Sequence, residues 1–125
     1  MDRAGWDLWT MGWMLSPAFM TQPEQVAAAL EAMMDPAYLV APAHGVAAQA
    51  DAIRTHNVMA RLPQMAAPTL VLVGADDVVT PVSCSQHLAA AIRNALLLVL
   101  ERGGHAVLAE NPEETAAAVL AFLAA

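Results

Sequence analysis

The chain has 125 residues, which is enough for one domain and too few for two. Apolar residues make up 58% of it and charged residues only 14%, so we expect a packed core rather than intrinsic disorder. A net charge of −7 and the absence of lysine argue against nucleic acid or an anionic membrane as a partner.

Cysteine content and the amino-terminal stretch bear on the compartment. Cys84 has no second cysteine to pair with, so no internal disulfide holds the fold and a reducing compartment fits. The stretch from Trp6 to Met20 is interrupted by glycine, serine and proline, unlike a signal peptide or a membrane span. We therefore expect a cytoplasmic protein.

The proportion of apolar residues exceeds what a small monomer needs to fill its core. We therefore expect self-association or a missing partner.

Residues 1–62 are predicted to form a helical, lid-like segment. Thr21 and Glu24 have the spacing of a capping box. The apolar residues that follow recur at helical spacing until Asp35 and Pro36 end the run. Such a Met-rich helix is usually plain core, but it would also suit a lid over a small-molecule pocket.

A second helix is expected in the same half of the chain. It begins at Pro42 or His44 and ends near Thr55. Val46 and Ile53 lie on one side of it, so that side is predicted to pack against other elements.

Residues 63–125 change to the order strand, helix, strand, helix. The runs Thr69–Val73 and Leu96–Leu100 are continuous and apolar, which is typical of strands buried on both faces. The pattern predicts an α/β fold in which a βαβα unit carries two parallel strands joined by a right-handed crossover.

The two helices of this unit have recognisable starts. Thr80 is predicted to cap the first and Asn111 to cap the second, each followed by a proline. The core stripe of the last helix is predicted to comprise Ala116, Val119, Leu120 and Leu123.

Each predicted strand ends in a glycine-containing turn that presents one ionisable residue, Asp77 after the first and His105 after the second. In open α/β sheets, ligands bind beyond the carboxyl ends of the strands. An imidazole with one nitrogen held by a carboxylate is fixed in tautomer and becomes a better base. Such a base can activate a serine, a cysteine or a water molecule.

Two segments carry a resemblance to a known family. Residues 67–81, Ala-Pro-Thr-Leu-Val-Leu-Val-Gly-Ala-Asp-Asp-Val-Val-Thr-Pro, resemble the acid-bearing strand and turn of the α/β-hydrolase fold. Gly103-Gly104-His105, followed by Glu110-Asn111-Pro112-Glu113, resembles its histidine loop and final helix. The order of acid and then histidine also matches the family.

The resemblance implies a partial α/β-hydrolase fold whose acid is Asp77, rather than Asp76, and whose base is His105. It implies a small ester or lactone as substrate and no cofactor. The segments from Trp13 to Met20 and from Asn57 to Leu62 are similar to the helical cap of lactonase-like and esterase-like members. Residues 63–125 would then be the core segment.

The chain departs from the family at the nucleophile. No Gly-x-Ser-x-Gly motif occurs in the sequence, and no oxyanion loop precedes one. The chain is therefore a fragment, a natural remnant or a small hydrolase with another nucleophile. Cys84 and Ser83 follow the acid turn and are the tentative substitutes, although their plainer interpretation is as small residues in the first turn of a helix.

Metal binding is not expected from the histidine pattern. His44, His56 and His87 share no metal-ligand spacing, and no pair of cysteines supports them.

Two functions follow from these observations. The first is a hydrolase of small esters or lactones that uses Asp77 and His105. The second is a non-catalytic association domain, because a two-stranded parallel sheet leaves open edges that proteins normally cover. Either a second copy of the chain or a complementing hydrolase segment would cover them.

Overall fold

The computed structural model describes residues 3–34 and 43–125. The predicted helix end at Asp35 and Pro36, and the predicted start at Pro42, lie outside these ranges. The elements run in the order α1 (Arg3–Met14), α2 (Pro17–Met20), α3 (Pro23–Met34), α4 (Ala43–Thr55), the 3-10 helix η1 (Met59–Gln64), β1 (Thr69–Gly74), α5 (Val82–Ala91), β2 (Ala95–Leu100), α6 (Val107–Glu110) and α7 (Pro112–Leu123).

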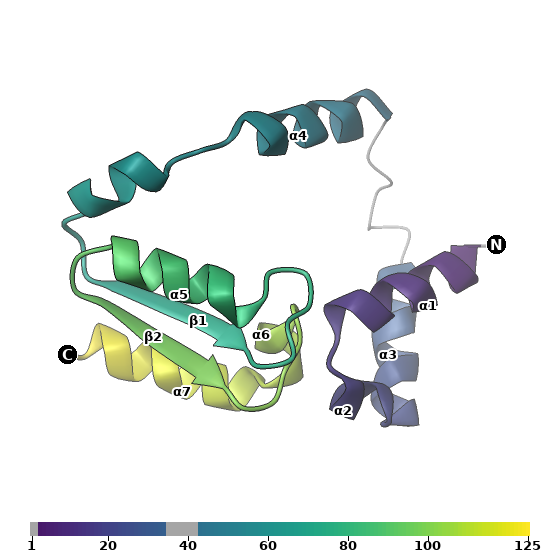
Figure 1. The fold of residues 1–125 in the computed structure, drawn as a ribbon. Coiled ribbons are helices and arrows are strands. Elements are labelled where there is room, and N and C mark those ends of the chain that lie inside the picture. The colour runs from purple at the N-terminus through teal and green to yellow at the C-terminus, as the bar shows by residue number, and fades with distance from the viewer. Residues whose placement is uncertain (1–2, 35–42) are drawn as a thin grey trace.

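The predicted pair of parallel strands is confirmed. β1 pairs with β2 in a register that runs from Thr69 opposite Ala95 to Gly74 opposite Leu100. Figure 1 shows α5 and α7 on opposite sides of this sheet. Because the register is unshifted, both strands end at the same edge, and the two turns that follow them lie together.

Burial of the two strands is unequal, which corrects the expectation that both are covered on both faces. Val73 in β1 is 4% exposed, whereas Leu96 in β2 is 57% exposed. Leu97 and Val99 of β2 are exposed as well. Among the described residues the sheet has two strands, and two strands with one helix on each side leave much of each face uncovered.

The last helix turns a different side toward the core from the one predicted. Leu120 and Leu123 are 66% and 73% exposed, and the less exposed side is formed by Thr115, Ala118 and Phe122. The helix is apolar almost all the way round, so its composition does not indicate which side is buried.

The amino-terminal helices form a group beside the carboxyl ends of the strands (Figure 1). Among the described residues the predicted capping box before α3 does not form: Thr21 ends α2, where its hydroxyl donates to the Ala18 carbonyl at 2.8 Å. Helix α4 agrees closely with its predicted bounds, but it stands apart from the sheet (Figure 1). Its predicted packing side is exposed, with Ile53 at 75%.

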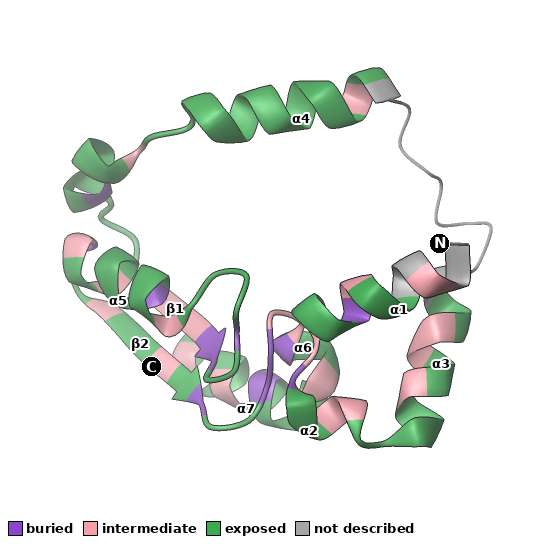
Figure 2. Cartoon of the chain, turned by 45° about the vertical axis from the view of Figure 1, so that its right-hand side comes forward, coloured by how far each residue is buried: buried purple, intermediate pink, exposed green. Residues whose placement is uncertain are grey.

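Buried residues gather at the strand ends and in the loops that follow them (Figure 2). The buried apolar residues are Met11, Leu62, Val73, Ile92, Leu100 and Val107. Val73, Leu100 and Val107 thus lie beside the two predicted functional turns, whereas Leu62 and Ile92 lie near the start of the strands. Within the described ranges, the helices are too short or too polar to cross a bilayer.

Candidate functional site

The turn after β1 and the turn after β2 are joined by backbone hydrogen bonds. Ala75 N donates to Leu100 O at 2.9 Å, and Asp76 N donates to Gly103 O at 3.0 Å. Gly74 lies at this junction, where a Cβ would stand 2.1 Å from the Gly103 carbonyl oxygen. The close approach of the two turns therefore requires glycine at this position.

The approach of the turns brings Asp77 and His105 into contact. Asp77 Oδ2 lies 3.0 Å from His105 Nδ1. The Asp77 side chain is only 5% exposed, whereas that of His105 is 32% exposed. The acid is thus enclosed by the fold, while the imidazole reaches solvent.

Three further donors hold the Asp77 carboxylate. Oδ1 accepts hydrogen bonds from the N–H groups of Val79 and Thr80 at 2.9 and 2.8 Å. Oδ2 accepts from the Thr80 hydroxyl at 2.9 Å. Burial alone raises the pKa of Asp77, but the bonds from the Thr80 N–H, the His105 imidazole, the Thr80 hydroxyl and the Val79 N–H outweigh it. The pKa of the carboxyl therefore lies below its ordinary value of 3.8, and Asp77 is ionised at neutral pH.

Thr80 has a different role from the predicted helix cap. Pro81 occupies the N-cap position of α5, and no side chain caps that helix. The Thr80 hydroxyl instead bonds Asp77 and lies 3.2 Å from His105 Nδ1. The hydroxyl donates to the carboxylate because Asp77 is a charged acceptor only three residues away, and Thr80 stands one residue before the position that could cap the helix.

The tautomer of His105 follows from its partner. An ionised carboxylate can only accept, so His105 Nδ1 carries the proton and Nε2 keeps its lone pair. Nε2 has no hydrogen-bond partner among the residues that the structure describes. The partly exposed imidazole therefore keeps one basic nitrogen that no described residue occupies.

A second carboxylate, Glu110, belongs to the segment that resembles the family's final helix, but the sequence analysis assigned no role to its side chain. It accepts hydrogen bonds from Gly104 N at 2.7 Å, from Ser16 N at 3.1 Å and from the Ser16 hydroxyl. Ser16 is only 2% exposed, and its hydroxyl also caps α2 by accepting from Phe19 N. Ser16 and Glu110 are 94 residues apart, so no local pattern indicates their contact.

The tentative nucleophiles lie near the acid turn but are not joined to the imidazole. Ser83 and Cys84 are exposed residues in the first turn of α5, and no hydrogen bond links either side chain to His105 within the described part of the chain. His44, His56 and His87 are exposed, and the described residues contain no cluster of three side chains that could hold a metal ion.

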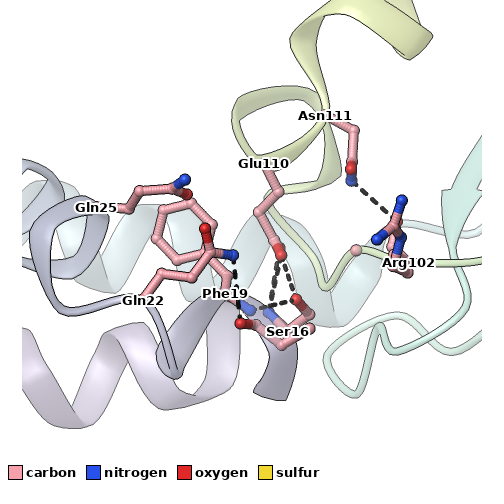
Figure 3. Close-up of a pocket in the computed structure, with 9 residues that line it drawn as sticks. Ser16, Phe19, Gln22, Gln25, Arg102, Glu110 and Asn111 are labelled. Atoms are coloured by element: carbon pink, nitrogen blue, oxygen red, sulfur yellow. Dashed lines mark hydrogen bonds between the residues drawn. The ribbon is translucent and has the colours of Figure 1, made fainter.

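A hollow of about 220 Å³ lies on the amino-terminal side of the histidine loop (Figure 3). Its lining is mostly polar and comprises Ser16, Ala18, Phe19, Gln22, Gln25, Arg102, Gly103, Glu110 and Asn111. Asn111 is at the N-cap of α7 as predicted, but its amide donates to the Arg102 carbonyl at 2.9 Å instead of capping the helix.

Two sequence comparisons relate the chain to hydrolases. The profile of the alpha/beta hydrolase family matches residues 2–118. The "Putative carbamate hydrolase RutD" of Pseudomonas savastanoi is 42% identical over 72 residues, which cover 58% of this chain and 28% of that protein.

Solved structures resemble nearly the whole chain. A hydrolase from Pseudomonas aeruginosa matches 99% of it with a TM-score of 0.78 and 32% identity. A thermophilic esterase from Thermogutta terrifontis matches 90% with a TM-score of 0.75 and 27% identity. The chain covers 45% and 40% of those two chains, so it spans less than half the length of the proteins it resembles.

Proposed function

Because the chain belongs to the alpha/beta hydrolase family, we propose that Asp77 and His105 are the acid and the general base of a hydrolase that acts on small esters or lactones. The observation that carries the proposal is the 3.0 Å contact between Asp77 Oδ2 and His105 Nδ1, which leaves Nε2 directed away from the acid. The proposed cap is residues 1–62 and the proposed core is residues 63–125.

The chemistry begins at the free nitrogen of His105. Nε2 takes the proton of an attacking hydroxyl, thiol or water as that group adds to the substrate carbonyl carbon. The buried Asp77 carboxylate stabilises the resulting imidazolium, which then gives the proton to the leaving group. Asp77 can do this because its pKa is lowered and it stays ionised.

The names of the relatives suggest the range of substrates to test. One relative is described as a putative carbamate hydrolase and another as an esterase. Esters, lactones and carbamates all have a carbonyl carbon bonded to a heteroatom leaving group. A panel of small substrates should therefore contain all three classes.

The nucleophile is unassigned, because the sequence contains no Gly-x-Ser-x-Gly motif. Cys84 and Ser83 are the candidates within the sequence, and a second copy or a complementing hydrolase segment is the alternative source. Without an oxyanion loop the rate should be low, because the loss of a single oxyanion donor typically costs about a hundred-fold in kcat.

The first experiment measures hydrolysis of an activated short-chain ester by the purified chain. We expect His105→Ala to remove most of the rate, because the general base is lost. His87→Ala is the matched control, since His87 is an exposed histidine on α5, and it should keep the rate. Equal rates in the wild type and His105→Ala, or no rate in either, would exclude a hydrolase formed by this chain alone. Cys84→Ser and Ser83→Ala then test the two candidate nucleophiles.

A second candidate, a non-catalytic association domain, is favoured by the exposed apolar side chains. Leu96, Ile53, Leu120 and Leu123 are each more than half exposed, which is unusual for so many large side chains in a small chain. This candidate predicts that the chain associates in a concentration-dependent way and hydrolyses no substrate. Sedimentation velocity over a range of concentrations measures the first, and a monomer at every concentration would exclude it.

A further inference from the structure

Both residues that flank His105 donate a backbone hydrogen bond to another segment of the chain. On one side, Gly104 N donates to the Glu110 carboxylate at 2.7 Å. On the other side, Ala106 N donates to the Met14 carbonyl oxygen at 2.8 Å. The imidazole is therefore carried by a loop whose two ends are fixed by partners outside the loop.

The Glu110 carboxylate serves two segments at once. Besides Gly104 N, it accepts from the backbone N–H and from the hydroxyl of Ser16 (Figure 3). It thus joins the turn between α1 and α2 to the histidine loop. A carboxylate accepts from all three donors at once, whereas an amide in its place keeps one acceptor oxygen and turns the other position into a donor.

The turn between α1 and α2 also packs directly on the histidine loop. A Cβ on Gly104 would lie 2.7 Å from Leu15 C, 2.8 Å from Ser16 N and 2.9 Å from Met14 O. Every one of these neighbours is a backbone atom. The loop backbone therefore rests against residues 14–16 with no side chain between them, and a shift of that turn would move the loop.

We propose that Glu110 is a positioning residue for His105, which holds the histidine loop against residues 14–16 so that Nδ1 meets Asp77. The proposal rests on the proposed function of His105 as the base. It also means that docking of the amino-terminal helices, and not only the strand ends, decides whether the imidazole has its catalytic orientation.

The test uses the tautomer of His105, which reports directly on the contact with Asp77. The wild type should carry the proton on Nδ1, because Asp77 accepts it. Glu110→Gln keeps the shape of the side chain but replaces one acceptor oxygen by a donor that faces the Ser16 N–H. The loop should loosen, and the excess of the Nδ1–H tautomer should be lost in favour of the Nε2–H form.

The measurement is a long-range proton–nitrogen NMR spectrum of the uniformly ¹⁵N-labelled full chain, recorded near neutral pH, together with a backbone amide spectrum of the same sample. Glu113→Gln is the matched control, because it removes the same charge from an exposed glutamate at the start of α7. It should leave the tautomer unchanged. Unchanged amide signals of Val79 and Thr80 show that the acid turn is still folded.

A milder variant keeps the proposal testable if Glu110→Gln does not fold. Ser16→Ala removes the hydroxyl, which donates to Glu110 and caps α2, but keeps the backbone N–H that also bonds Glu110, so it should shift the tautomer in the same direction but less. An unchanged tautomer in every folded variant would overturn the proposal. Where ester hydrolysis is measurable, Glu110→Gln should lower kcat about ten- to a hundred-fold with little effect on KM, as expected for a displaced base. A tautomer shift without any hydrolysis would support the positioning role and refute the hydrolase.

Discussion

Gly74 is the position where a single added methyl group should destabilise the fold most. A Cβ there would lie 2.1 Å from Gly103 O, 2.5 Å from Gly103 C and 2.7 Å from Gly104 O. All three are backbone atoms, so no side chain can rotate away. The histidine loop must retreat by roughly an ångström before the shortest contact reaches 3.0 Å, the limit that real Cβ atoms respect.

The free-energy cost can be estimated from these contacts. Overpacking of a tight site costs about 1–3 kcal/mol, and backbone neighbours favour the upper end. Retreat of the loop also weakens the bond from Asp76 N to Gly103 O, which is worth about 1 kcal/mol. We expect Gly74→Ala to destabilise the fold by about 3 kcal/mol, or to prevent folding.

Gly12→Ala is the matched control for this substitution. Gly12 lies inside α1, and a Cβ there would meet no atom within 4 Å. Alanine in a helix should stabilise the chain by roughly 0.5–1 kcal/mol. The assay is urea unfolding followed by circular dichroism, in which the two variants should move the midpoint in opposite directions. A change of less than about 0.5 kcal/mol for Gly74→Ala would refute the reasoning from close approach.

Two further predictions concern stability. The Thr115 hydroxyl is buried and has no hydrogen-bond partner among the described residues. Thr115→Val should therefore stabilise the chain by about 1 kcal/mol in urea unfolding, and a loss of stability would indicate an unrecognised acceptor. The pKa of Asp77 is lower in the folded chain than its ordinary value of 3.8, so its contribution is present above that value and is lost as the pH falls through the folded-state pKa. Urea midpoints recorded from about pH 7 to about pH 2 should decrease once the pH is below about 4. Asp77→Asn should make that decrease less steep. An equally steep fall in Asp77→Asn would assign the acid sensitivity to other carboxylates.

The βαβα unit was predictable because its signals are local. Apolar runs such as Thr69–Val73 have strand length and end in glycine turns, and this pattern gave β1 and β2 to within one residue. Parallel strands with an unshifted register then bring the following turns together. The contact between Asp77 and His105 follows from that arrangement.

Features that depend on the exact start of a helix or on distant contacts were not predictable. Thr80 is of a type favoured at helix N-caps, but Pro81 occupies that position and the Thr80 hydroxyl donates to the Asp77 carboxylate. The bond between Ser16 and Glu110 joins segments at opposite ends of the chain, and neither residue has a neighbour that indicates it. The prediction of which side of α7 is buried was wrong, because residues such as Leu120 make the helix apolar on more than one side.

The partly exposed strand β2 also bears on how we expect the chain to behave in solution. Residues 95–100 carry no charge and no proline, and such segments add readily to the edges of their own copies. Within the described residues, the outer edge of β2 has no strand beside it. Arg93, Glu101 and Arg102 flank the segment, and all three are exposed. Charges at the ends of such a run oppose stacking, so we expect these three residues to limit self-templated aggregation of the chain.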